Sequence, residues 1–144
     1  MTASRTTISE LSSLLRPSLL RLTRLVRNQR VDMSVTLTQL SAMNTLHKHG
    51  PMSAGELATC EKVQPPSMSK VLANLEERGL VRRDAHPGDR RQAIIAITAP
   101  GVELLDSERR SRDAWLTQRI ATLTADERAL LHRVVPILDK LAEQ

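Results

Sequence analysis

Three charged residues, Asp89, Arg90 and Arg91, follow a Pro-Gly pair and come just before an apolar run. A Pro-Gly pair marks a turn, and the short run of β-branched and small residues at 93–97 predicts a buried strand. Residues 81–84 supply the strand before the turn, so the charges are expected at the tip of a protruding hairpin. Arginine at such a tip can enter a minor groove of duplex DNA, where the potential is negative. Asp89 is expected to pair with one arginine and fix its direction; the alternative is an ordinary surface ion pair.

A second set of polar residues lies in QPPSMSKVLANLEERGL, residues 64–80. Pro65 and Pro66 suit the first turn of a helix and Gly79 suits its end, which predicts a helix over residues 65–78. The apolar residues of this helix fall on one narrow face. In the N-terminal half of the helix, the opposite face carries small and polar side chains. Hydroxyl, amide and ammonium groups on such a face can contact base edges or phosphates. The candidate DNA-binding residues are therefore Gln64, Pro66, Ser67, Ser69, Lys70, Asn74, Asp89, Arg90 and Arg91.

Capping boxes and periodic apolar residues predict the helices that position these side chains. A capping box is a Ser or Thr followed three residues on by Glu or Gln, and TLTQ, SAGE and TADE, which begin at residues 36, 53 and 124, each open a helix. Helices are also expected at residues 8–30 and, after the N-cap Thr98, at 100–122. Pro17 is expected to bend or restart the first helix, and Pro136 to kink or end the last one.

The order of these elements predicts a mainly α fold with a small β-hairpin. A short helix, a tight connection and a second helix make a helix-turn-helix, whose second helix enters a major groove. A hairpin placed directly after that helix is a wing. The expected architecture is a winged helix-turn-helix.

Composition narrows the class of partner. The chain has 144 residues, which is the size of one ordinary domain. Lys and Arg number 21 against 16 Asp and Glu, and the resulting formal charge of +5 favours a polyanionic partner. There is no Tyr or Phe and only one Trp. Because binding of single strands by base stacking needs aromatic side chains, double-stranded DNA is the expected partner.

Several other functional classes lack support. Cys60 is the only cysteine, and no two histidines lie three or four residues apart, so neither a metal site nor a cofactor is expected. No cluster of acid, base and nucleophile stands out, so the chain is not expected to be an enzyme. The N-terminal residues are interrupted by Glu10, Arg16 and Pro17, which argues against a signal peptide or a membrane span and favours a cytoplasmic protein.

Taken together, these motifs resemble the MarR family of winged-helix transcriptional regulators. LEERGLVRR followed by DAHPGDRRQAIIAITAPGVELL is similar to the family's recognition-helix end, its wing with Asp-Arg-Arg, and its Thr-x-x-Gly entry to the next helix. QPPSMSKVLANL is similar to the start of that recognition helix. The resemblance implies a sequence-specific regulator, usually a repressor, that binds a pseudo-palindromic operator. It also implies release from DNA by a small-molecule effector such as a small aromatic acid or a phenol.

The resemblance further implies a homodimer in which the first, fifth and sixth helices interleave. Apolar stripes at both ends of the chain independently favour this arrangement, because neither has a complete partner within so short a chain. The stripe of the first helix consists of Ile8, Leu11, Leu15, Leu19, Leu22 and Val26. We therefore expect a single MarR-type domain over residues 1–144, with dimerisation helices at 1–33 and 100–144 and a DNA-binding region at 34–99.

The effector mechanism and one other class of function stay open. Oxidant-sensing members of the family use a cysteine in the first helix with tyrosines nearby, whereas Cys60 ends the short third helix and is expected to be a small buried residue. A ligand crevice is the preferred mechanism; Met43, His47 and Trp115 are candidates for its lining that could equally belong to the core. Alternatively, the arginines of the first helix could bind an anionic membrane surface. That function would leave the wing unexplained.

Overall fold

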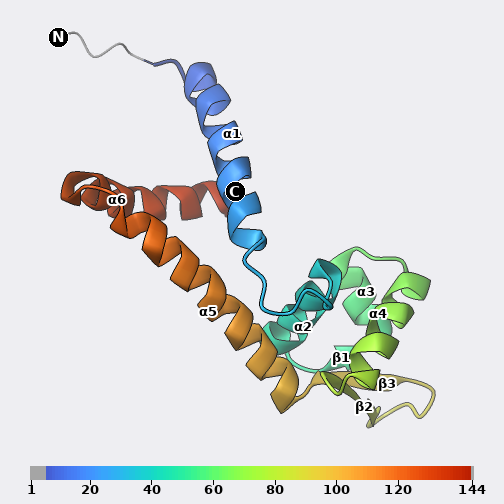
Figure 1. Ribbon diagram of the computed structural model, residues 1–144. Coiled ribbons are helices and arrows are strands. Elements are labelled where there is room, and N and C mark those ends of the chain that lie inside the picture. The colour runs from blue at the N-terminus through green and yellow to red at the C-terminus, as the bar shows by residue number, and fades with distance from the viewer. Residues whose placement is uncertain (1–5, 144) are drawn as a thin grey trace, which may run out of the picture. The chain divides into compact units, whose positions relative to one another are not determined.

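The computed structural model describes residues 6–143 and has a mainly α-helical fold with a small sheet (Figure 1). Along the chain the elements are α1 (Ile8–Arg27), α2 (Leu37–His49), β1 (Met52–Ser53), α3 (Ala54–Glu61), α4 (Pro65–Glu77), β2 (Val81–Ala85), β3 (Ala93–Ile97), α5 (Ala99–Ala121) and α6 (Ala125–Ala142). The short α3 and α4 form the predicted helix-turn-helix, and the β2–β3 hairpin follows directly as the wing. The winged helix-turn-helix predicted from the order of elements is confirmed.

Capping boxes open the helices where the sequence predicts them. The side chains of Thr36, Ser53 and Thr124 each accept a hydrogen bond from the backbone N–H three residues on, whose side chain in turn accepts from the cap backbone. A further box at Thr7 opens α1. Each box satisfies N–H groups that a helix start leaves without partners. At the other end of α2, Gly50 has a φ of 86°, which glycine adopts without strain.

The prolines of the two terminal helices do not end them. α1 runs through Pro17, and α6 runs through Pro136. The restart considered for Pro17 and the early end considered for Pro136 therefore do not occur. A proline removes a single N–H from the helix ladder, and the turns on either side keep their own hydrogen bonds.

The three strands form one antiparallel sheet in the order β1-β3-β2. β2 pairs with β3 along its whole length, from Val81 opposite Ile97 to Ala85 opposite Ala93. The sequence did not predict β1, whose two residues pair with the middle of β3. A strand of two residues is too short to show the alternation by which strands are predicted.

One hydrophobic core lies among α2, α3, α4 and the sheet. The narrow apolar face predicted for residues 65–78 is confirmed, because Met68, Leu72 and Leu75 are fully buried. Each such side chain contributes about 1.5–3 kcal/mol when it is fully buried. α4 is thus held by one face, and its opposite face stays free. The other large apolar side chains that are fully buried are Val35, Met43, Leu46, Leu57 and Ile95.

The Thr-x-x-Gly segment forms a tight junction between the hairpin and α5. The hydroxyl of Thr98 donates to the carbonyl oxygen of Gly79 at 2.6 Å and accepts from the N–H of Gly101 at 3.3 Å. A Cβ added at Gly101 would lie 2.3 Å from the carbonyl oxygen of Leu80. Only glycine allows this approach, so the first turn of α5 is fixed against the residue that precedes β2.

The chain divides into two compact units. Residues 30–110 form one, and the described residues up to Gln29 and from Ser111 on form the other. In the second unit, α1 and α6 have no buried residue. Their large exposed apolar side chains are Ile8, Leu11, Leu14, Leu19, Leu20, Leu22 and Leu25 on α1, and Leu130, Leu131, Val135, Ile137 and Leu141 on α6. Apolar surface of this extent is typical of a protein interface; the assignment of residues 1–33 and 100–144 to dimerisation stays a prediction.

Cys60 is exposed, so its expected burial is wrong. It lies in the last turn of α3, where Leu57 and Ala58 are the buried residues. The face of α3 that packs on the core therefore carries Leu57 and Ala58, and Cys60 lies beside this face. A cysteine is commonly buried, but that tendency carries no information about which face of a short helix it occupies.

Candidate nucleic-acid interface

Helix α4 turns its polar side toward solvent. Gln64 is its N-cap residue but makes no side-chain cap hydrogen bond, and Pro65 and Pro66 fill the first turn. Proline suits these positions because their N–H groups would have no partner within the helix. The predicted residues Gln64, Pro66, Ser67, Ser69, Lys70 and Asn74 are all exposed. The structure thus brings this part of the predicted site together on one side of one helix.

An open groove of about 540 Å³ lies between α4 and the start of α2. The polar residues of α4 that line it are Ser67, Lys70 and Asn74, whose spacing of three and four residues places them on one stripe. The remaining lining residues are Thr36, Thr38, Gln39, Val63 and Val71. The residues from α2 are absent from the predicted set, because the capping box already explains Thr36 and Gln39 and gives no sign of a second role.

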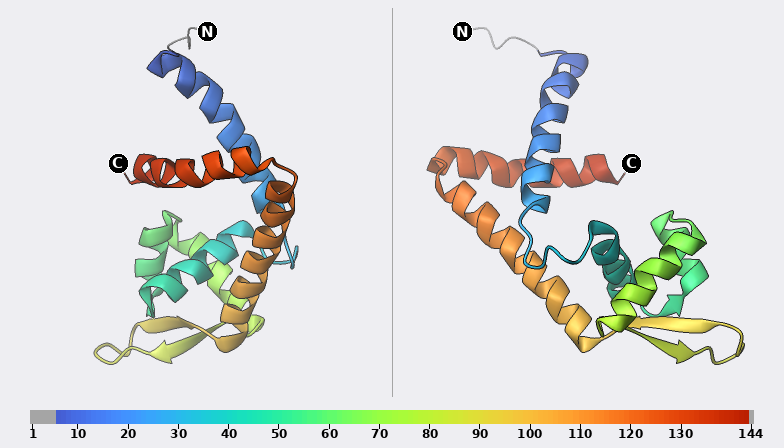
Figure 2. Two further views of the ribbon diagram at one scale, coloured as in Figure 1. Left: turned by 90° about the vertical axis from the view of Figure 1, so that its left-hand side faces the viewer. Right: turned by 45° about the vertical axis from the view of Figure 1, so that its right-hand side comes forward.

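Hydrogen bonds to the backbone shape the tip of the hairpin, residues 86–92. Nδ1 of His86 accepts from the N–H groups of Gly88 and Asp89, both at 3.0 Å. The N–H of His86 donates across the loop to the carbonyl oxygen of Gln92 at 3.3 Å. The loop extends beyond the helices of its own unit (Figure 2), so its side chains are accessible to a large partner.

Asp89 stabilises the tip in a different way from the predicted one. Its carboxylate accepts from the backbone N–H of Arg91 at 2.9 Å. Within residues 6–143 it makes no ion pair with Arg90 or Arg91. The predicted pairing is therefore wrong: an aspartate two residues before a free N–H closes a local turn, which needs no ordered arginine side chain. Both guanidinium groups are left for an outside partner.

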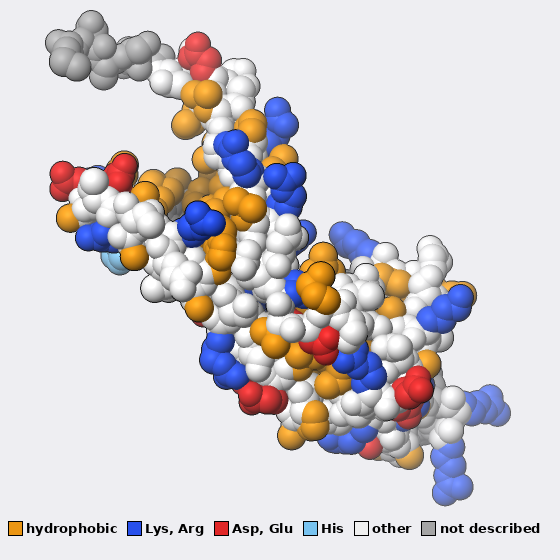
Figure 3. Space-filling model, in the orientation of Figure 1, with side chains coloured by type: hydrophobic (Ala, Val, Ile, Leu, Met, Phe, Trp, Pro, Cys, Tyr) orange, Lys and Arg blue, Asp and Glu red, His pale blue; other side chains and the backbone are white. Residues whose placement is uncertain are grey.

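The positive charges of α4 and the hairpin fall into two groups. Three of them are paired with a carboxylate at 2.7–3.0 Å: Arg78, Arg82 and Arg83. In the described part of the chain, the cations of these elements that have no such partner are Lys70, Arg90 and Arg91, all predicted from the sequence. Figure 3 shows basic side chains standing out from the surface where Figure 1 draws the β2–β3 hairpin. An unpaired cation is available to neutralise a phosphate without first breaking an internal ion pair.

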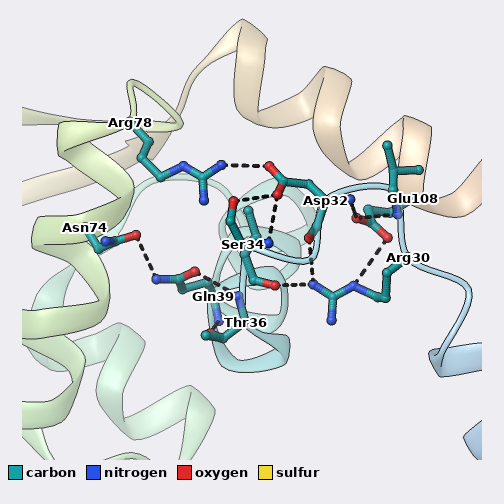
Figure 4. A network of polar contacts seen from close by, with 10 residues as sticks. Arg30, Asp32, Ser34, Thr36, Gln39, Asn74, Arg78 and Glu108 are labelled. Carbon is teal, nitrogen blue, oxygen red and sulfur yellow. Dashed lines mark hydrogen bonds and ion pairs between the residues drawn. The ribbon is translucent and has the colours of Figure 1, made fainter.

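A polar network ties the end of α4 to the segment before α2 and to α5 (Figure 4). Glu108 of α5 is 1% exposed and accepts from the backbone N–H groups of Val31 and Asp32 at 3.2 and 3.1 Å. Arg30 faces the same carboxylate at 3.5 Å. Asp32 in turn pairs with Arg78, the C-cap residue of α4, at 2.7 Å. A buried carboxylate needs such partners to offset its lost hydration, so the network fixes this segment.

The Asp32 carboxylate is held in its charged form. The hydroxyl and the backbone N–H of Ser34 donate to it, and these hydrogen bonds, with that of Arg78, lower its pKa. Groups that donate to a carboxylate favour its ionised state. The ion pair to α4 therefore persists throughout the neutral range of pH.

The candidates for an effector site differ in their surroundings. Met43 is fully buried in the core of the 30–110 unit, whereas His47, one turn later on α2, is exposed. Trp115 belongs to the other unit and is half-buried, with the guanidinium carbon of Arg119 5.2 Å from its ring centroid, within reach of a cation–π interaction. Met43 is accounted for by core packing, and an effector lining that includes His47 or Trp115 stays a prediction.

Neither a metal centre nor a membrane crossing is found in residues 6–143. No three His, Cys, Asp or Glu side chains of this range are grouped so that they could hold a metal ion. His47 and His49 lie two residues apart on α2, and both are exposed. No helix in the same range is both long enough and apolar enough to cross a membrane.

Comparison with known proteins places this fold among transcriptional regulators. The model of the MarR family matches residues 35–93, which contain α2, α3, α4 and the hairpin up to the start of β3. An uncharacterized HTH-type transcriptional regulator from Mycobacterium leprae is 38% identical over 136 residues, covering 94% of this chain and 95% of that protein. The HTH-type transcriptional repressor NicR of Pseudomonas putida is 33% identical over 98 residues, covering 68% of this chain and 62% of NicR. A solved structure of a candidate transcriptional regulator from Pseudomonas aeruginosa has a TM-score of 0.81 and 29% identity, covering 94% of this chain and 95% of that one.

Proposed function

The chain belongs to the MarR family of winged helix-turn-helix transcriptional regulators, and on this premise we propose that it is a sequence-specific repressor that binds a pseudo-palindromic operator as a homodimer. Members of this family regulate transcription and bind DNA as dimers; they are not enzymes. The observation that carries the proposal is the shared exposure of the polar side of α4 and of Arg90 and Arg91 on the wing, which have no ion-pair partner within residues 6–143.

In this proposal α4 lies in the major groove. Small side chains such as Ser67 and Ser69 let the helix approach the base edges closely. The hydroxyl of Ser67 can donate or accept, whereas that of Ser69 donates to the carbonyl oxygen of Pro65 at 3.0 Å and can accept from a base. Lys70 can reach the acceptors of guanine or a phosphate. Because the opposite face of α4 is locked into the core, the helix presents these groups in a fixed orientation, which selective binding requires.

The wing is proposed to enter the adjacent minor groove. Arg90 and Arg91 are drawn there by the negative potential, which is strongest where the groove is narrow. Contacts of this kind supply affinity and register, with little reading of individual bases. Asp89 then contributes indirectly, since its carboxylate holds the backbone of the tip.

Two copies of the chain are proposed to pair through the apolar faces of α1 and α6. These faces are exposed within one chain, and each Leu or Ile that a partner covers completely contributes about 1.5–3 kcal/mol. Pairing also explains why the operator would be pseudo-palindromic, because a two-fold dimer presents two copies of α4. The two half-sites should lie about one helical turn apart, roughly 10 base pairs from centre to centre.

The repressor role and the effector complete the proposal. NicR is a transcriptional repressor and shares 33% identity with this chain, which favours repression over activation. An effector releases DNA only if it binds the DNA-free arrangement more tightly than the DNA-bound one. A small aromatic acid or a phenol is proposed as its chemical class, on the family resemblance alone.

Selection of bound fragments from genomic DNA, followed by titration of one selected duplex against a scrambled copy, tests the proposal. Lys70→Ala and Ser69→Ala should each reduce the preference for the selected duplex by about 1–3 kcal/mol. Lys140→Ala, which removes an exposed lysine from α6, is the matched control and should leave the preference unchanged. Equal affinity of the parent protein for both duplexes would overturn sequence-specific binding.

Sedimentation of the DNA-free protein tests the dimer. The proposal expects a dimer and no folded monomer, because a monomer would leave both apolar faces in water. A folded monomer at micromolar concentration would contradict it.

A further inference from the structure

A buried glutamine of α2 contacts the exposed asparagine of α4 (Figure 4). Gln39 is only 7% exposed. Its Oε1 accepts from the backbone N–H of Thr36 at 2.9 Å, and its Nε2 donates to Oδ1 of Asn74 at 2.9 Å. One side chain therefore completes the capping box of α2 and also holds a candidate DNA-binding residue.

The backbone fixes the orientation of both amides. A backbone N–H can only donate, so the atom of Gln39 that faces Thr36 must be its oxygen. The NH₂ group of Gln39 then faces Asn74, and a donor requires an acceptor opposite it. The atom of Asn74 on that side must therefore be Oδ1, an assignment that follows from the hydrogen-bond network.

The free end of Asn74 is consequently a donor. Its Nδ2 donates to no group within residues 6–143, and the side chain is exposed and lines the groove beside Ser67 and Lys70. Any partner that enters the groove meets the NH₂ group, while Oδ1 is directed toward α2.

We propose that Gln39 is a positioning residue that makes Asn74 a hydrogen-bond donor toward DNA, so that this position selects an acceptor. The inference rests on the proposed function. The acceptor can be O6 or N7 of guanine, O4 of thymine, or a backbone phosphate. An asparagine with a free oxygen can instead make a bidentate contact with adenine. Gln39 disfavours that contact because it engages Oδ1.

Gln39→Glu tests the proposal because it should reverse the orientation of the Asn74 amide. The glutamate still accepts from the N–H of Thr36, since glutamate suits the third position of a capping box. Its other oxygen now requires a donor, so Asn74 must turn its NH₂ group inward and its oxygen outward. Selection of duplexes from a randomised pool, followed by competitive titration, compares this variant with the parent.

The result shows whether the acceptor that Asn74 contacts belongs to a base or to a backbone phosphate. If Asn74 contacts a base, one base pair of the selected site should change from guanine or thymine to cytosine or adenine, with a preference of roughly fivefold or more. If Asn74 contacts a phosphate, the selected sequence should stay the same, and affinity should fall by one common factor for selected and scrambled duplexes. Either result supports the proposal.

Controls separate positioning from general damage to the fold. In an Asn74→Ala background, Gln39→Glu should leave base preference unchanged, since no amide remains to be turned. Affinity should fall there only by the factor that the added negative charge costs on every duplex, and this factor should be smaller than the effect in the presence of Asn74. Asn74→Asp also places a hydrogen-bond acceptor toward the groove, and it keeps Gln39. It therefore replaces Gln39→Glu if thermal melting shows that the Gln39→Glu variant is unfolded. The aspartate accepts from Gln39 and turns its second oxygen to the groove.

Two outcomes would overturn the inference. In the first, Gln39→Glu changes neither the selected DNA sequence nor the affinity. In the second, Gln39→Glu changes base preference and affinity equally in the presence and in the absence of Asn74. Both require a parent protein that selects an operator. Failure of the parent itself to discriminate among duplexes would instead overturn the proposed function.

Discussion

Replacement of Arg91 by alanine isolates the contribution of the wing to DNA binding. Arg91 is exposed and forms no ion pair within residues 6–143. The tip uses only its backbone N–H, which donates to Asp89. Arg91→Ala therefore keeps the hydrogen bonds of the tip, and the free energy of unfolding should change by less than about 0.5 kcal/mol.

The size of the binding effect follows from counterion release. Each phosphate contact contributes about 0.9 to the slope of log K against log salt concentration, so loss of one contact from each wing of a dimer lowers the slope by about 1.8. Over a fourfold rise in salt, roughly 50 to 200 mM, the parent protein should then lose about 12-fold more affinity than the variant. Because groove potential and phosphate act on any sequence, selected and scrambled duplexes should be weakened by comparable factors.

Fluorescence anisotropy titrations at several salt concentrations measure this slope. Arg91→Lys is the matched control, because it keeps the charge and should keep the slope. An Arg91→Ala variant whose affinity and slope equal those of the parent would show that Arg91 of the wing does not contact DNA.

Other substitutions test separate features of the structure. Gly101→Ala should lower the free energy of unfolding by about 1–3 kcal/mol or more in urea titrations, because its Cβ would lie 2.3 Å from the carbonyl oxygen of Leu80; an unchanged midpoint would contradict this close approach. Cys60→Ser should bind operator DNA and respond to the effector as the parent does, whereas release of DNA by peroxide from the parent alone would identify the cysteine as a sensor. Asp32→Asn should be less stable than the parent at neutral pH, and the difference should disappear as pH falls well below the ordinary value of 3.8, because hydrogen bonds from Ser34 lower the pKa of the folded state and their stabilisation is lost on protonation. A difference that stays constant across that range would contradict this assignment.

Features encoded locally could be predicted from the sequence. A capping box involves residues three apart, and the boxes predicted at Thr36, Ser53 and Thr124 open helices in the structure. The hairpin was predictable for the same reason, because its turn residues and its apolar strand are adjacent in the chain. The candidate cations Lys70, Arg90 and Arg91 could be identified because they flank these local signals.

Features that depend on distant contacts could not be predicted in this way. β1 exists only because two residues pair with β3, about forty positions later. The link from Gln39 to Asn74 joins residues 35 positions apart, and the contact of Glu108 with residues 31 and 32 spans more than twice that distance. A buried glutamate in a charged helix looks like any solvated residue until the segment that covers it is known. The side of α3 on which Cys60 lies is likewise decided by packing.

In the proposed complex, two chains together bind one duplex through α4 and the wing. Sedimentation velocity with a fluorescent duplex tests it most directly, using one fragment selected from genomic DNA and a scrambled copy of equal length. We expect the selected duplex to sediment with two chains of 16.0 kDa at protein concentrations that leave the scrambled duplex free. A complex of one chain per duplex, or equal occupancy of both duplexes, would contradict it.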